Sequence, residues 1–485
     1  MEELKQYIIS NKVTVSKLHA ETHDANDRLL PQRNLFVKLR QYADGFFDRG
    51  EQPRLLALSG LRGVGKTTLM WQTAKHIFEN KTQEIYFFNV DDLNRLGYRL
   101  YDAFTVLEND ILQKPFHELD YPIVFLIDEV HESEGWDKDL KILYEKCKKA
   151  FIMCTGSSAL LLHQSPDLAS RWSLIRLYPF RFAEFIQAKS WMENTSKQLF
   201  AQKGLGSKLK QILFYSENIE NLEHELKQNK SSIDEYLNKV SNTFTKLTID
   251  ELINEYISYH NIARFLSIKN KSLINDRIID LFERILYKDI PVFAKIESNE
   301  VELMFRLLLR IALSDEINME KLAGSIGCKQ TQVEHFIETL HKAEILNVLS
   351  PYGGTKLKTG LSKKPFFMSP SLRRALYQRV YGENIEERLR AKLYEDIVAM
   401  YLRRVLQEPG LLSFGLSTKS VSPDFIIETG DSPVVIEVGT NKTTIRQTEK
   451  YLEKKRYGII ISASATDYSI RDNTLVIPLS WFLLL

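Results

Sequence analysis

The sequence predicts a multidomain α/β protein in which a helical lead-in and a parallel-sheet core are followed by helical and mixed units. Three observations predict this class. Short apolar runs alternate with helical segments between residues 51 and 185, strand-like runs are rare from 186 to 290, and two new patterns of helices and strands follow. A chain of 485 residues is long enough for about two to four domains, and its 44% hydrophobic and 26% charged residues are typical of globular proteins.

Helices are expected first and a parallel sheet second. Residues 1–50 have a helical pattern, interrupted by a polar break at Glu21–Arg28 (ETHDANDR). The core, residues 51–185, contains apolar runs of strand length separated by helical segments, which indicates parallel strands. We expect these strands at Leu55–Ser59, Ile85–Val90, Ile123–Asp128, Phe151–Thr155 and Leu174–Tyr178.

A phosphate-binding loop joins the first expected strand to a helix at Thr68–Phe78. It has the form G-x-x-x-x-G-K-T, whose glycines let backbone N–H groups face one anion while the helix N-terminus adds partial positive charge. Lys66 is expected to reach the β- and γ-phosphates of ATP, and the Thr67 hydroxyl to bind Mg²⁺. The complete motif disfavours a plain glycine-rich turn. The residues predicted to bind nucleotide are Gly60, Leu61, Arg62, Gly63, Val64, Gly65, Lys66, Thr67 and Thr68.

Two adjacent acids end the apolar run Tyr121–Val130 (YPIVFLIDEV). Ligands of open α/β sheets bind at the C-terminal edge of the strands, where the phosphate loop also lies. We therefore expect Asp128 to hold Mg²⁺, and Glu129 to orient and deprotonate the attacking water. Taken alone the pair could be ordinary strand-end acids, but its place after the phosphate loop favours catalysis.

Further candidates for contact with the γ-phosphate follow the fourth strand. Small hydroxyl residues end the segment FIMCTGSS, so Thr155, Ser157 or Ser158 is a candidate sensor, and we assign Ser157 to nucleotide binding. A simple strand-to-helix cap is the alternative. Arg171 and Arg176 are candidate catalytic arginines that would stabilise transition-state charge, with a structural ion pair as the alternative for each.

A helical unit and a winged helix are expected after the core. Residues 186–290 predict a helical lid or insert, for which a plain helical spacer is the alternative. Residues 291–381 predict a winged helix, because a helix and a helix-turn-helix pattern precede a hairpin with a Gly-Gly turn. Its elements are expected at Leu303–Leu313, Met319–Ile326, Lys329–Leu340, Ala343–Ser350 and Lys356–Met368.

The expected wing makes DNA a candidate partner. Between Gly353 and Val380 the chain has basic residues and no acids, so this face could neutralise several phosphates. A solvated surface, or a unit that packs internally, is the alternative. The basic residues are Lys356, Lys358, Lys363, Lys364, Arg373, Arg374 and Arg379.

The last unit, residues 382–485, predicts a second α/β domain. A long helix at Ile385–Leu406 precedes the strands, and another helix is expected at Thr443–Lys455. The strands are expected at Leu411–Phe414, Pro423–Glu428, Pro433–Val438, Tyr457–Ser462 and Thr474–Pro478.

Four segments, GLRGVGKTT, IVFLIDEV, CTGSSALLL and ASRWSLIRLYPFRFAEF, together resemble a family of prokaryotic AAA-type P-loop ATPases. The resemblance covers most of the chain and implies an ATPase core, a winged helix and a C-terminal domain similar to the PD-(D/E)xK nuclease fold. It also favours a ring-shaped homo-oligomer, with a monomer as the alternative. Two departures, Ser170 before Arg171 and Ala183 in the segment FAEF, weaken any definite role for Arg181.

The same resemblance implies a nuclease-like site in the last unit. Such a site needs a helix glutamate, an aspartate at a strand start and an E-x-K pair, whose acids bind Mg²⁺. The matching acids are Glu395, Asp424 and Glu437, but Gly439 stands where the lysine is expected, and Lys442 is the candidate replacement. The missing lysine favours a domain that has lost cleavage and serves in binding or assembly.

The composition gives no indication of a membrane span or of a metal site built from cysteines. No run of about eighteen apolar residues occurs, so no membrane span is expected, and three cysteines without metal-ligand spacing fit a reducing cytoplasm. The sequence thus predicts a cytoplasmic, Mg²⁺-dependent ATPase that binds ATP and ADP. Two alternatives are a slow nucleotide switch that controls an unidentified protein partner, and an ATP-driven DNA-binding or nuclease effector.

Overall fold

The computed structural model describes residues 1–156, 170–195, 199, 203–294, 296–314, 318–354, 363–382, 387–416, 422–441 and 455–485. The chain forms two compact units. The first consists of Met1–Tyr178 together with Lys288–Lys295, and the second consists of Pro179–Tyr287 and Ile296–Leu485. Among the described residues, no helix is both long and apolar enough to cross a membrane.

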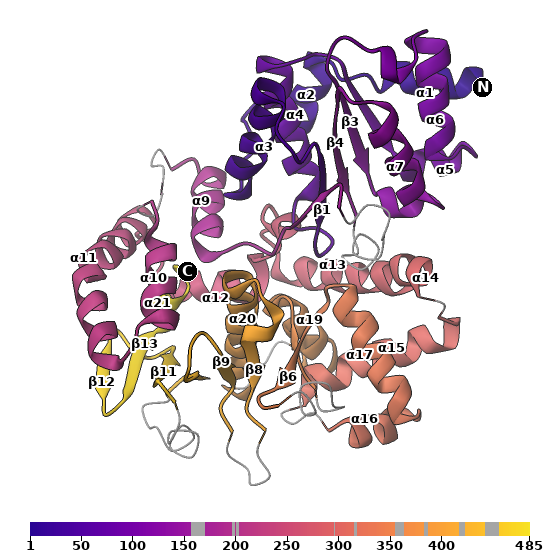
Figure 1. Ribbon diagram of the computed structural model, residues 1–485. Coiled ribbons are helices and arrows are strands. Elements are labelled where there is room, and N and C mark those ends of the chain that lie inside the picture. Colours follow the sequence, from indigo (N-terminus) through magenta and orange to yellow (C-terminus); the bar gives the residue numbers. More distant parts are fainter. Residues whose placement is uncertain are drawn as a thin grey trace. The chain divides into compact units, whose positions relative to one another are not determined.

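The first unit is built on a five-stranded parallel sheet with the strand order β2-β3-β4-β1-β5. Its strands β1, β3 and β4 are labelled in Figure 1. Every residue of β1, β3 and β4 is buried, which is why these strands are continuous apolar runs. The expected strands of the core are therefore confirmed, with ends that shift by one or two residues. The observed bounds are β1 (Leu55–Ser59), β2 (Ile85–Asn89), β3 (Ile123–Asp128), β4 (Ala150–Thr155) and β5 (Ser173–Arg176).

Helices cover both faces of this sheet. On one face, side chains from α1, α6 and α7 join Phe88 and Phe125 in one hydrophobic core. On the other face, Trp71 of α4 packs against Phe87 at a ring distance of 4.7 Å, and α3 packs against β4. The helices of this unit are α1 (Glu2–Ser10), α2 (Val15–Thr22), α3 (Leu35–Arg49), α4 (Lys66–Asn80), α5 (Val90–Arg95), α6 (Leu100–Val106), α7 (Trp136–Lys146) and α14 (Ile290–Phe293).

The second unit begins with helices, in agreement with the helical pattern of its sequence. The longest, α11, buries Leu222, Leu226, Ile233 and Val240 along one side, and the Asn218 side chain caps its first turn. The helices of this unit are α9 (Phe182–Met192), α10 (Leu205–Tyr215), α11 (Ile219–Thr243), α12 (Ile249–Glu255), α13 (Lys271–Arg284), α15 (Ser298–Leu313), α16 (Met319–Ile326), α17 (Gln330–Lys342), α19 (Pro370–Tyr381), α20 (Glu387–Leu406) and α21 (Leu479–Phe482).

An eight-stranded mixed sheet organises the rest of the second unit, in the order β12-β13-β11-β10-β9-β8-β6-β7. The hairpin expected as a wing, β6 with β7, belongs to this sheet because β6 pairs in parallel with β8. The sequence pattern did not indicate β12, and the helix expected at 443–455 lies almost wholly outside the described residues. The strands are β6 (Leu346–Pro351), β7 (Lys364–Phe367), β8 (Leu412–Phe414), β9 (Phe425–Ile427), β10 (Val434–Gly439), β11 (Tyr457–Ser462), β12 (Ser469–Arg471) and β13 (Thr474–Pro478).

Candidate functional site

The phosphate loop lies between β1 and α4, at the C-terminal edge of the parallel sheet. Gly60, Gly63 and Gly65 have φ angles of +146°, +85° and +98°, which side chains rarely allow. A Cβ atom on Gly60 would also lie 2.2 Å from the Leu177 carbonyl oxygen, so this position requires glycine. The Lys66 ammonium donates to the carbonyl oxygens of Gly60, at 2.8 Å, and Leu61, at 3.3 Å.

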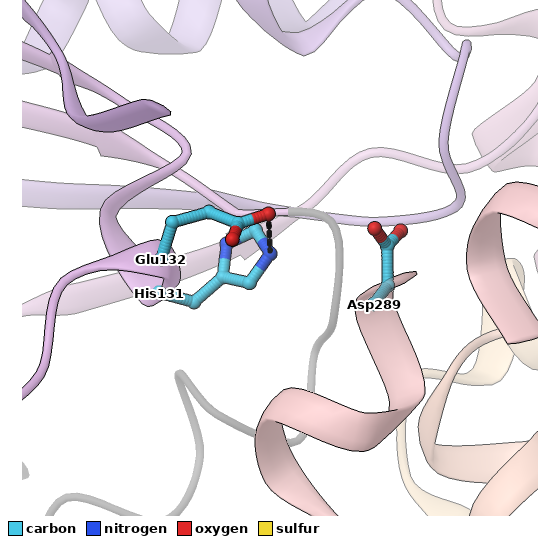
Figure 2. A group of neighbouring side chains, drawn as sticks. All are labelled: His131, Glu132 and Asp289. Atoms are coloured by element: carbon cyan, nitrogen blue, oxygen red, sulfur yellow. Dashed lines mark ion pairs between the residues drawn. The ribbon is translucent and has the colours of Figure 1, made fainter. Parts of the chain in front are cut away.

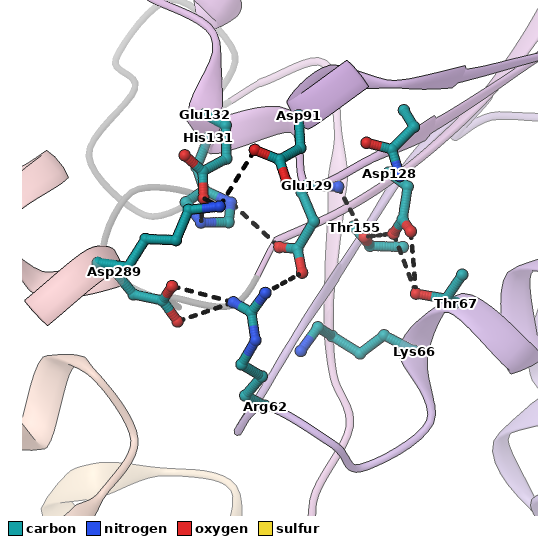
Figure 3. Close-up of polar contacts among 12 residues, drawn as sticks. Arg62, Lys66, Thr67, Asp91, Asp128, Glu129, His131, Glu132, Thr155 and Asp289 are labelled. Carbon is teal, nitrogen blue, oxygen red and sulfur yellow. Dashed lines mark hydrogen bonds and ion pairs between the residues drawn. The ribbon is translucent and has the colours of Figure 1, made fainter. Parts of the chain in front are cut away.

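Asp128, the last residue of β3, lies next to this loop, and the end of β4 lies between β3 and β1 (Figure 3). The Thr67 hydroxyl, in the first turn of α4, lies 3.1 Å from both carboxylate oxygens of Asp128. Thr155, at the end of β4, donates to Asp128 and accepts the Glu129 N–H at 3.2 Å. Burial, and then the charge of Glu129, raise the pKa of Asp128. A hydroxyl and a carboxylate at this spacing are the oxygen ligands that Mg²⁺ prefers, so the donor set fits that ion.

Glu129 has an unusual backbone conformation, with φ +54° and ψ +44°. This left-handed geometry directs its side chain toward Arg62 and His131 (Figure 3). One carboxylate oxygen lies 3.3 Å from a guanidinium nitrogen of Arg62, and the other lies 3.6 Å from Nδ1 of the buried His131. Glu129 is therefore held in a charged network beside the phosphate loop.

Arg62 has a second acidic partner that the sequence analysis missed. One guanidinium nitrogen donates to both carboxylate oxygens of Asp289, at 2.9 and 3.0 Å. Both side chains are almost completely buried. Asp289 is 227 residues away from Arg62 in the chain and directly precedes the short helix α14. No local sequence signal marks it, because an aspartate before a four-residue helix has no distinguishing pattern.

His131, Glu132 and Asp289 form a cluster beside this pair (Figure 2). One ligand-type atom of each lies within 4.8 Å of the others. Burial lowers the pKa of His131 and raises the pKa of Glu132. Because Asp289 binds Arg62 and Lys288 lies 3.9 Å from Glu132, we describe the cluster as part of the ion-pair network.

The remaining predicted contacts of the nucleotide lie on the segment after β4. Ser157 and Ser158 lie outside the described residues. Arg171 forms an ion pair with Glu145 at 2.9 Å, which is the structural alternative considered for it. Arg176 ends β5 and pairs in register with Ser59, next to the phosphate loop. Catalytic roles for the two arginines stay predictions.

The second unit contains a further polar cluster, in which a lysine that the sequence analysis did not place there contacts two of the three predicted acids. Glu395 comes from α20, Asp424 precedes β9 and Glu437 lies on β10, and all three are buried. The Lys364 ammonium, from the first residue of β7, lies 3.4 Å from Asp424 and 3.8 Å from Glu395. Burial opposes its charge, but the carboxylates outweigh burial and raise the pKa of Lys364. Lys442, the replacement expected from sequence, lies outside the described residues.

Two of the basic residues assigned to the DNA-binding face have other partners. Arg373 is buried and binds Asp396, while Arg374 is buried and donates to Asn275 and Tyr259. Both guanidinium groups are therefore engaged inside the second unit and are not available to DNA phosphates. Lys356 and Lys358 lie outside the described residues.

Two family models match the chain. Residues 52–186 match the AAA domain, and residues 253–384 match a domain of unknown function, DUF8612. The first match assigns an AAA-type P-loop ATPase domain to the segment that carries the phosphate loop and Asp128. The winged helix and the nuclease-like domain stay predictions.

Two uncharacterized relatives match this chain over different lengths. An uncharacterized protein of Methanocaldococcus jannaschii, MJ1637, is 27% identical over 491 residues, which cover 100% of this chain and 95% of the relative. An uncharacterized protein of Haemophilus influenzae is 26% identical over 166 residues, 33% of this chain and 38% of the relative.

Two solved structures also align with part of the chain. The RuvB Holliday junction branch migration motor of Thermotoga maritima is 16% identical with a TM-score of 0.29, over 67% of this chain and 92% of that one. The ORC1 protein of Aeropyrum pernix in complex with DNA is 12% identical with a TM-score of 0.33, over 73% and 94%.

Proposed function

We propose that the first unit is a Mg²⁺-dependent ATPase, with Asp128 and Thr67 as the metal ligands and Glu129 as the general base. The observation that carries this proposal is the contact between the Thr67 hydroxyl and the Asp128 carboxylate at 3.1 Å, directly beside the phosphate loop. When bound, Mg²⁺ supplies charge neutralisation for the phosphates.

The residues of the loop have separate tasks in this proposal. Backbone N–H groups of the glycine-rich turn and the first turn of α4 bind the phosphate oxygens, and Lys66 moves from loop carbonyls to the β- and γ-phosphates. Glu129 accepts the proton of the attacking water as the new bond to the γ-phosphorus forms and the bond to the ADP oxygen breaks. Thr155 supports both acids, because it donates to Asp128 and accepts the Glu129 N–H.

The test is phosphate release from ATP by the full chain. We expect Lys66→Ala to lose nucleotide binding, and Glu129→Gln to bind ATP while turnover stops. Undiminished hydrolysis by Lys66→Ala would refute the site. Adding duplex or single-stranded DNA separates the remaining alternatives, because stimulation by DNA supports a nucleic-acid effector. Slow hydrolysis that is indifferent to DNA, with tightly bound ADP after purification, supports a nucleotide switch and a search for a protein partner.

A second candidate function is metal-dependent phosphodiester cleavage in the second unit. The observation that favours it is Lys364, whose ammonium lies among Glu395, Asp424 and Glu437 and could replace the lysine missing at position 439. The acids would hold Mg²⁺, and Lys364 would orient the attacking water.

Cleavage of labelled single-stranded and duplex DNA and RNA tests this function, in the presence of Mg²⁺ or Mn²⁺. We expect Asp424→Asn and Lys364→Met each to abolish cleavage while ATP hydrolysis persists. Absence of cleavage by the wild-type protein on every substrate would refute the function and leave the domain with a binding or assembly role.

A further inference from the structure

Arg62 of the phosphate loop lies between two carboxylates and contacts each through a different guanidinium nitrogen, Nη1 for Asp289 and Nη2 for Glu129. Its guanidinium makes the shorter contacts with Asp289, at 2.9 and 3.0 Å, and the longer contact with Glu129, at 3.3 Å. The side chain is 9% exposed, so water screens these charges only weakly. If the Asp289 contacts were lost, the guanidinium would be free to approach Glu129 more closely.

The pairing of Arg62 has a direct consequence for Glu129. A carboxylate oxygen that pairs with a guanidinium is engaged and is less available to accept a hydrogen bond from water. A general base must instead offer its oxygen to the attacking water. Arg62 bound fully to Glu129 would therefore slow hydrolysis, and Asp289 limits that binding by holding Arg62 itself.

Asp289 belongs to a segment with an unusual place in the chain. The residues Lys288–Lys295, which we call the return segment, are part of the first unit, although the chain before and after them belongs to the second. Ion pairs attach the return segment to the first unit, since Lys288 lies 3.1 Å from Asp91 while Asp289 binds Arg62. The second unit is thus covalently joined to both ends of a segment that contacts the proposed catalytic site.

We propose that Asp289 is a positioning residue for ATP hydrolysis, which acts by holding Arg62 so that the Glu129 carboxylate remains available to water. The inference rests on the proposed ATPase function. Withdrawal of the return segment would release Arg62 to Glu129 and slow turnover, which gives the second unit a means to control hydrolysis in the first.

The test compares kcat at saturating ATP for the wild type, Asp289→Asn, Arg62→Gln and the double variant. We expect Asp289→Asn to lower kcat about fivefold, which corresponds to a barrier higher by about 1 kcal/mol, while its Kd for ATP changes by less than about twofold. In the Arg62→Gln background the same substitution should have no effect, because no guanidinium is left to redirect. Asp289→Glu keeps the charge and should restore most of the activity.

A matched control is Asp280→Asn, which makes the same chemical change at an exposed aspartate of α13 and should leave kcat unaltered. Two outcomes would overturn the role of Asp289: a kcat for Asp289→Asn equal to or above that of the wild type, or the same loss with and without Arg62. A wild-type protein without hydrolysis, or one in which Glu129→Gln stays active, would instead refute the proposed function and the role of Asp289 with it.

Discussion

Asp396 in α20 forms a buried ion pair with Arg373 in α19 whose removal should destabilise the second unit. Arg373 Nε lies 2.6 Å from one carboxylate oxygen of Asp396, and a second guanidinium nitrogen lies 3.0 Å from the other. The Phe367 N–H donates to the same carboxylate at 2.9 Å. The side chains of Arg373 and Asp396 are 3% and 0% exposed. Asp396→Asn keeps the shape of this side chain but removes its charge.

The expected loss follows from this burial. Removing one partner of a buried pair leaves the other charge uncompensated and costs about 3–5 kcal/mol in the free energy of unfolding. A control is Glu283→Gln, where an exposed glutamate lies 4.0 Å from Arg379, and which should cost less than about 1 kcal/mol. Replacing both partners by apolar residues, Arg373→Met with Asp396→Leu, should recover most of the loss because no charge is then left buried.

Urea unfolding of the full chain, followed by circular dichroism, measures these differences. A loss below about 1 kcal/mol for Asp396→Asn would refute the reasoning, because the pair would then behave like an exposed one. The result also bears on DNA binding. If Arg373 is required for stability in this way, it cannot be counted among the basic residues that contact phosphates.

Three further predictions follow from single positions. Gly60→Ala should abolish ATP binding measured by titration calorimetry, because a Cβ would lie 2.2 Å from a backbone carbonyl oxygen, and retained affinity would contradict the assigned loop geometry. Thr155→Val should lower kcat about tenfold or more while ATP still binds, because it removes the charge-assisted hydrogen bond from Thr155 to Asp128. An unchanged kcat would exclude a role for Thr155 in supporting Asp128. In a thiol-reagent assay of the native protein, Cys328 should react fastest, because it is only half-buried while burial raises the pKa of Cys147 to about 11 and of Cys154 to about 12; faster reaction of either buried thiol would contradict this order.

The sequence alone determined the ATPase core and its local site. The five strands, the loop from Gly60 to Thr68 and the acids Asp128 and Glu129 follow from patterns of a few residues. Buried strands are apolar runs, and a phosphate loop needs glycines, a lysine and a threonine at set spacings. Parallel order then brings the strand ends to one edge, so the meeting of Thr67 with Asp128 was also predictable.

Only the tertiary structure decided which charged residues, far apart in the sequence, pair with one another. Asp289 reaches Arg62 across 227 residues, and Lys364 joins Asp424 across 60. The sequence pattern placed Lys364 and Arg373 together on a basic surface, yet Lys364 contacts Asp424 and Glu395, and Arg373 is buried against Asp396. The sequence around a charged residue does not indicate which residue it will pair with. Coulomb attraction depends on distance in space and on burial, and the packing of the chain sets both.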